Sequence, residues 1–153
     1  MFLINLGSHL LSQYLFLKNM ALNLRIAGIF LISLSFVHVV FPKYFNWTNE
    51  LRNLSLINRQ MMYVHTFFIG LILLLMGALC LTSTNELIKT ELGSKLAFGL
   101  GIFWTTRLVI QFLGYSSKLW KGKRLETIIH VFFSLSWTYL SIVFFYVYFM
   151  FKA

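Results

Sequence analysis

Residues 61–81 read MMYVHTFFIGLILLLMGALCL, a run without a single charged side chain. A helix needs roughly 20 mostly apolar residues to cross the hydrocarbon core of a bilayer. This stretch therefore predicts a transmembrane helix. Three further stretches are also mostly apolar, at about 21–41, 96–115 and 127–150. The sequence thus predicts an all-α, polytopic membrane protein built as a four-transmembrane-helix bundle.

The composition agrees with this fold class. Of 153 residues, 59% are hydrophobic and only 11% are charged, whereas a water-soluble domain needs more ionisable surface. Residues 20–153 are expected to form one domain, whose first span ends before Pro42 because proline disfavours a continuing helix. Residues 1–19 are expected to be an N-terminal extension, either an interfacial helix or a consequence of start-site choice. The second alternative arises because a chain that starts at Met20 would still contain all four predicted spans.

Basic residues dominate the charge, with 13 Lys and Arg against 4 acidic residues. They are scattered around the apolar runs instead of forming one stripe, which argues against nucleic-acid binding. The expected location is a membrane, as a multi-pass protein of the bacterial inner membrane. The positive-inside bias favours a cytoplasmic side for the connections after the first and third spans, with both termini outside. These connections hold Lys43, Arg52, Arg59, Lys118, Lys121, Lys123 and Arg124.

The pattern R-x5-H-x-F-F occurs twice, from Arg59 through His65 to Phe68 and from Arg124 through His130 to Phe133. Each copy opens a predicted span from the same membrane face. One interpretation is a duplication, with two tandem hairpins in parallel orientation. The other is chance, because Phe makes up 17 of the residues.

Arg107 is the most informative residue of the predicted third span, and Gln111 follows it on the same helical face. A cation at membrane depth is normally paired or placed in a wet cavity. Glu126, which begins a polar face of the fourth span with His130, is the candidate partner, and Glu50 is the alternative. The three interpretations are a structural Arg–Glu pair, a site for an anion or substrate, and a side chain that reaches to the interface.

Three histidines, His38, His65 and His130, are expected near the same membrane face. They could bind a metal ion, or His65 and His130 could be the axial ligands of a b-type haem. Acid–base or quinone-related roles are further alternatives. The structural alternative is that each ring only donates a hydrogen bond to a carbonyl or a headgroup.

Arg59, Lys123 and Arg124 border the predicted second and fourth spans. Arginine forms bidentate hydrogen bonds to phosphate, so these residues could bind the headgroup of an anionic lipid. The simpler interpretation is a helix cap with interfacial anchors. Gly70 and Gly77, one heptad apart in the second span, are expected to allow close packing between helices.

The runs HVVFPKYFNWTNEL (38–51) and LINRQMMYVHTFFIGL (56–71) resemble a motif of uncharacterised small four-span bacterial membrane proteins. The resemblance covers most of the chain after Met20 and implies the fold alone. The functional hypothesis is a polar site near one membrane face that could bind a metal ion or haem, with catalysis left open. The alternatives are an accessory subunit of a membrane complex and a small transporter that forms a homodimer. The candidate residues are His38, His65, Arg107, Gln111, Glu126 and His130.

Overall fold

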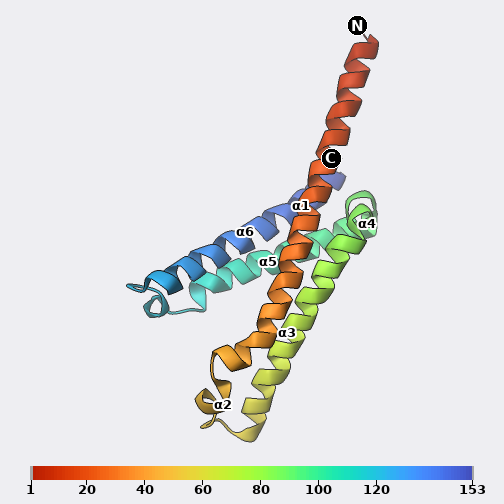
Figure 1. Ribbon diagram of the computed structural model, residues 1–153. Coiled ribbons are helices and arrows are strands. Elements are labelled where there is room, and N and C mark those ends of the chain that lie inside the picture. The colour runs from red at the N-terminus through yellow and green to blue at the C-terminus, as the bar shows by residue number, and fades with distance from the viewer. Residues whose placement is uncertain (1, 153) are drawn as a thin grey trace. The chain divides into compact units, whose positions relative to one another are not determined.

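The computed structural model describes residues 2–152, with the side chains of Leu11 and of residues 13–152. Within these residues all regular secondary structure is helical, without a strand. Four helices are long and apolar enough to cross a membrane. The predicted all-α class with four long apolar helices is therefore confirmed. The elements are α1 (Phe2–Tyr44), α2 (Trp47–Glu50), α3 (Leu56–Thr82), α4 (Thr84–Lys89), α5 (Glu91–Leu113), the short 3₁₀ helix η1 (Ser117–Leu119) and α6 (Arg124–Lys152) (Figure 1).

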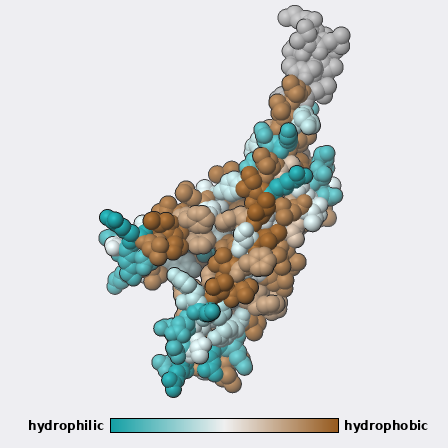
Figure 2. Space-filling model, in the orientation of Figure 1, coloured by the Kyte–Doolittle hydropathy of each residue, from teal (hydrophilic) through white to brown (hydrophobic). Residues whose placement is uncertain are grey.

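Large apolar side chains lie on the outside of the long helices. Val39, Phe67 and Leu135 are each about two-thirds exposed or more, at 76%, 66% and 66%. Figure 2 shows apolar surface along the helices, while hydrophilic surface gathers at the connection between α5 and α6 and around α2. A protein dissolved in water rarely exposes so much contiguous apolar area. The surface therefore suits a hydrocarbon environment along the helices and an aqueous one at the connections.

The chain divides into two compact units, and Leu24–Thr84 forms the second of them. Here the last part of α1 packs antiparallel to α3. The helices approach most closely where Gly28 meets Gly77, because a Cβ atom added to Gly77 would lie 2.8 Å from the carbonyl oxygen of Gly28. Gly70 faces Ser35 and His38 at ordinary contact distances. The expected role of Gly77 in close packing thus has a defined counterpart on α1.

The first unit consists of the described residues of Met1–Asn23 and Asn85–Ala153. Its centre is the antiparallel pair of α5 and α6, in which Phe98 contacts Tyr148 near one end and Gln111 contacts His130 near the other. The first part of α1 runs along α6. The ring of Phe16 contacts that of Tyr146 in a tilted arrangement at a centroid distance of 5.4 Å, and the Tyr139 hydroxyl donates a hydrogen bond to the side-chain oxygen of Asn23 at 3.1 Å.

One expectation about α1 needs correction. The helix does not end before Pro42 but includes it and continues to Tyr44. Proline removes one N–H donor, yet the helical turn persists because Phe45 N–H donates to the carbonyl oxygen of Phe41 at 2.9 Å. The helix starts at Phe2, and its membrane-compatible part begins at Gln13. The interpretation of residues 1–19 as an N-terminal extension, either an interfacial helix or a consequence of start-site choice, stays a prediction.

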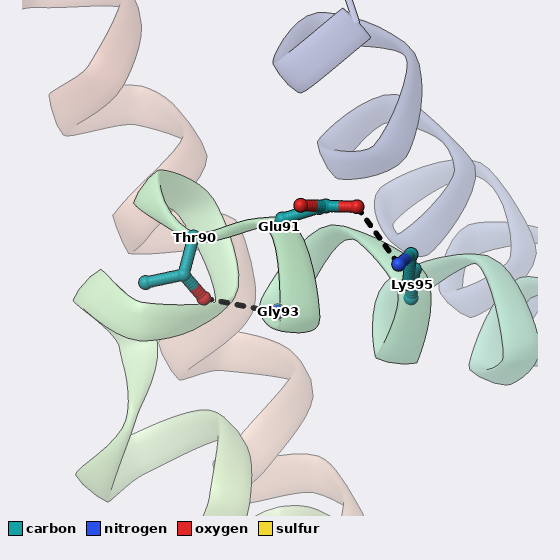
Figure 3. A network of polar contacts seen from close by, with 4 residues as sticks. All are labelled: Thr90, Glu91, Gly93 and Lys95. Carbon is teal, nitrogen blue, oxygen red and sulfur yellow. Dashed lines mark hydrogen bonds and ion pairs between the residues drawn. The ribbon is translucent and has the colours of Figure 1, made fainter.

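A tight corner joins α4 to α5. The Thr90 hydroxyl caps α5 by accepting a hydrogen bond from Gly93 N–H at 3.0 Å, and Glu91 forms an ion pair with Lys95 at 2.8 Å (Figure 3). The cap satisfies a backbone donor that the first turn of a helix otherwise leaves without a partner. The corner thus begins the helix that carries Arg107 and Gln111.

Replacing Thr90 by valine is expected to lower the free energy of unfolding by about 1 kcal/mol, because valine keeps the side-chain shape but removes the capping oxygen. Lys95→Gln is the control within the same turn. Its ion pair is exposed on both sides, and such pairs contribute little. Unfolding of the detergent-solubilised protein, followed by circular dichroism, measures both. Equal stability of Thr90→Val and the parent protein would contradict the capping role.

Candidate functional site

Arg107 occupies α5 two turns before the helix ends, and it is half-buried. Its Nη1 donates a hydrogen bond to Oε1 of Gln111, one turn further along, at 3.0 Å. The guanidinium carbon lies 5.1 Å from the ring centroid of Trp137 and 5.9 Å from that of Tyr115. A cation over an aromatic face is attracted by the electron density of the ring. One amide and two aromatic rings therefore hold this charge in an apolar helix.

Gln111 links Arg107 to the neighbouring helix. Its side chain is buried, and its Nε2 lies 3.0 Å from Nδ1 of His130 on α6. Because the guanidinium is purely a donor, it fixes the oxygen of the amide toward Arg107 and the NH2 group toward the histidine. Nδ1 of His130 must then accept. An Nδ1 atom that accepts belongs to a neutral imidazole that carries its proton on Nε2.

Aromatic rings enclose the imidazole of His130. Trp120 stacks on it with a centroid distance of 4.0 Å and an interplanar angle of 8°, and Phe112 meets it edge-on at 5.6 Å. The Thr127 hydroxyl bonds to the carbonyl oxygen of Trp120 at 2.8 Å, which ties the connection back onto α6. The turn also needs Gly122, whose φ of 83° is unfavourable for other residues. The connection thereby places Trp120 over His130.

A second aromatic stack lies deeper in the hairpin. Trp104 and Trp137 are parallel at 5.0 Å and 14°, and Phe133 stacks on Trp137 at 5.4 Å. Among the described residues, the buried Trp104 Nε1 has no hydrogen-bond partner. The cation of Arg107 therefore lies against Trp137, the ring that belongs to both stacked pairs.

The predicted pairing of Arg107 with Glu126 is not present. In the part of the chain that the structure describes, the only salt bridge is the one between Glu91 and Lys95. The antiparallel register explains this, because Arg107 lies opposite Trp137, which is about 16 Å along α6 from Glu126. Glu126 is exposed in the first turn of α6. Glu50 belongs to the other unit, so its pairing with Arg107 stays a prediction.

Three hydroxyl groups of α6 are satisfied within the helix. Ser134, Thr138 and Ser141 each donate to the carbonyl oxygen four residues earlier, at 2.8 Å in every case. They therefore need no partner on another helix. His130 and Trp137 of α6, in contrast, contact residues of α5.

The two remaining candidate histidines belong to the other unit. His38 Nδ1 lies 2.9 Å from the Leu34 carbonyl oxygen, and His65 Nδ1 lies 2.8 Å from that of Met61. These bonds leave Nε2 of each ring available to another group. Within the described residues, no three His, Cys, Asp or Glu side chains are grouped so that they could hold a metal ion. The three-histidine metal site and the His65–His130 haem site stay predictions.

The basic residues near the candidate site are exposed. Lys118, Lys121, Lys123 and Arg124 lie in or beside the connection between α5 and α6, at the end of the hairpin where Gln111 meets His130. Arg59 lies near the start of α3, in the other unit. The structure thus combines Arg107, Gln111 and His130 in one hydrogen-bonded chain next to a basic connection.

Sequence reasoning missed Trp120 and Tyr115 as parts of this site. Both follow the apolar stretch of α5, where an aromatic residue is usually interpreted as an interfacial anchor. A tryptophan between basic residues at the end of a hairpin was the available signal. Its stacking partner could not be identified without the geometry of the turn.

The comparisons with known proteins add no relative: no family model, no curated protein and no solved structure matches the chain. The fold and the site alone therefore define its class. It is a small helical protein with four helices able to cross a membrane, and a cationic hydrogen-bonded cluster lies within one of its hairpins.

Proposed function

We propose that this chain is a small multi-pass integral membrane protein that binds an oxyanion, a carboxylate or a phosphate group, at Arg107 on the α5–α6 hairpin. The observation that carries the proposal is that Arg107 has no carboxylate partner among the described residues, although its helix is apolar. A charge in the middle of a spanning helix costs roughly 2.5–3.5 kcal/mol on insertion scales. An anionic ligand offsets that cost.

The hydrogen-bonding groups of the site favour the same class of ligand. A guanidinium has five N–H donors, and Gln111 takes one of them. The Nε2–H of His130 is a further donor, without a hydrogen-bond partner among the described residues. Arg107 and His130 thus offer donors and positive charge, so a matching ligand supplies acceptors and negative charge.

The basic connection indicates how such a ligand reaches the site. Lys118, Lys121, Lys123 and Arg124 are exposed at the same end of the hairpin, and clustered positive charge raises the local concentration of anions. At a membrane surface it also attracts anionic headgroups, by about 1 kcal/mol per basic residue. The shared chemistry is a phosphate or carboxylate, supplied either by a lipid headgroup or by a soluble anion.

Titration calorimetry of the detergent-purified protein tests the proposal. The probes are short-chain phosphatidylglycerol, short-chain phosphatidylcholine and inorganic phosphate. We expect binding of phosphatidylglycerol or inorganic phosphate but not of the zwitterionic lipid. Binding of the first alone identifies a lipid as the source, and binding of inorganic phosphate identifies a soluble anion.

Arg107→Gln is expected to weaken this binding at least about tenfold, since hydrogen bonds to charged groups contribute about 1.5–3 kcal/mol. Arg25→Gln is the matched control, because Arg25 is also an arginine of an apolar helix but is exposed and belongs to the other unit. It should bind like the parent protein. Unchanged affinity of a folded Arg107→Gln variant, or no anion binding by the parent protein, would refute the proposal.

A further inference from the structure

Gln111 contacts the cation with one end of its amide and the imidazole with the other. From this geometry we infer that the site takes up one proton on His130 together with each anion that Arg107 binds. The inference rests on the proposed anion site and adds its regulation. The amide of Gln111 would be the element that communicates between the two events.

The unliganded arrangement disfavours a protonated His130. A charged imidazole carries a proton on both nitrogens, so its Nδ1–H would point at the NH2 group of Gln111 across a distance that is now 3.0 Å. Rotating the amide by half a turn removes that conflict but points its NH2 group at the guanidinium of Arg107. Either orientation leaves two donors facing each other in a mostly buried place, which costs free energy.

An anion removes the conflict. When its oxygens accept the N–H groups of Arg107, the guanidinium no longer depends on Oε1 of Gln111. The amide is then able to turn and accept a hydrogen bond from Nδ1–H of a protonated His130. The negative charge of the ligand favours the imidazolium as well. Anion binding and proton binding therefore strengthen each other, as linked equilibria must.

Other charged groups around His130 affect its protonation equally with and without a bound anion, so they do not produce the linkage between anion and proton binding. On its own helix, Glu126 lies one turn before it and is exposed. On α5, Arg107 reaches it through Gln111. The connection that packs through Trp120 carries Lys118, Lys121 and Lys123, all exposed to solvent and screened there. None of these is positioned to exchange a hydrogen-bond partner when the anion arrives.

Calorimetry at about pH 5.5 and about pH 7.5 tests the inference, because an imidazole in water titrates near pH 6.5. The probe is short-chain phosphatidylglycerol, whose phosphodiester keeps one negative charge over this range; if the site takes only soluble anions, sulfate replaces it for the same reason. Affinity should be about tenfold higher at the lower pH, and linkage to one proton limits the change to tenfold per pH unit. In buffers of different ionisation enthalpy, the heat should report net proton uptake on binding.

Four variants assign the effect. His130→Gln and Gln111→Leu should keep a measurable affinity for the anion but lose most of the pH dependence of that affinity. The first variant lacks the group that takes up the proton, and the second lacks the amide that links this group to Arg107. Glu126→Gln and His65→Gln are the controls, because each removes a titratable group that lies outside this chain of hydrogen bonds. Both should retain the pH dependence. Anion binding that depends on Arg107 but is equal at both pH values would overturn the inference and leave the proposed function intact. Loss of pH dependence in His65→Gln would overturn it as well, whereas absence of any binding refutes both.

Discussion

Replacing Gly93 by alanine is expected to destabilise the first unit by about 3 kcal/mol or more. A Cβ atom at this position would overlap the carbonyl oxygen of Glu86 and would lie 2.6 Å from Cα of Leu87. Both obstacles are backbone atoms, which cannot rotate away as a side chain does. The corner between α4 and α5 must therefore open, and the cap that Thr90 provides to α5 is lost with it.

Gly99 is the matched control on the same helix. A Cβ atom there meets nothing within 4 Å, so Gly99→Ala should be neutral or stabilise the helix by up to about 1 kcal/mol. Unfolding in mixed micelles with increasing SDS, followed by circular dichroism, compares the two variants. If Gly93→Ala proves as stable as Gly99→Ala, the close contact between α4 and α5 is not part of the folded protein.

Gly77→Ala is expected to have the second largest effect, a loss of about 2 kcal/mol in the second unit. The added methyl group would lie 2.7 Å from Cγ1 of Ile32 and 2.8 Å from the carbonyl oxygen of Gly28. The side chain can adjust, but the carbonyl oxygen belongs to α1, so the two helices must separate. Faster hydrogen exchange in the part of α3 around Gly77, toward the C-terminal end of the helix, would report this separation locally.

Gly70→Ala separates the steric effect from a general effect of alanine. Its nearest neighbour would be Cβ of His38 at 3.4 Å, an ordinary contact. The variant should keep the exchange rates of the parent protein. Similar exchange in Gly77→Ala and Gly70→Ala would contradict the close crossing at Gly28.

The fold class was predictable from sequence because it depends on length and polarity alone. The run at 61–81 and the three similar runs correspond to α3, α1, α5 and α6. Helix ends were less predictable. Pro42 was expected to stop a helix, yet a single missing donor near the end of a long helix does not prevent one further turn. The tandem arrangement of the hairpins and the position of the protein in a membrane stay predictions.

The candidate site was partly accessible from helical spacing. Residues four apart share a face, which places Gln111 beside Arg107, and the structure shows that pair hydrogen-bonded. The predicted pairing of Arg107 with Glu126 was wrong, because opposite charge alone does not reveal which residues of two packed helices lie opposite each other. Only the antiparallel register of α5 and α6 shows that Glu126 lies far from Arg107 while His130 reaches Gln111. The roles of these residues in binding stay predictions.

The distribution of tryptophan gives the protein an optical property. Of its 4 tryptophans, Trp104, Trp120 and Trp137 stand on the α5–α6 hairpin and stack against its rings, while Trp47 packs edge-on against Tyr63 in the other unit. Removing Trp47 alone would leave an intrinsic emission spectrum that comes from one hairpin. A charge that moves off the face of Trp137, or a ring that lifts from Trp120, would change that spectrum without any attached dye.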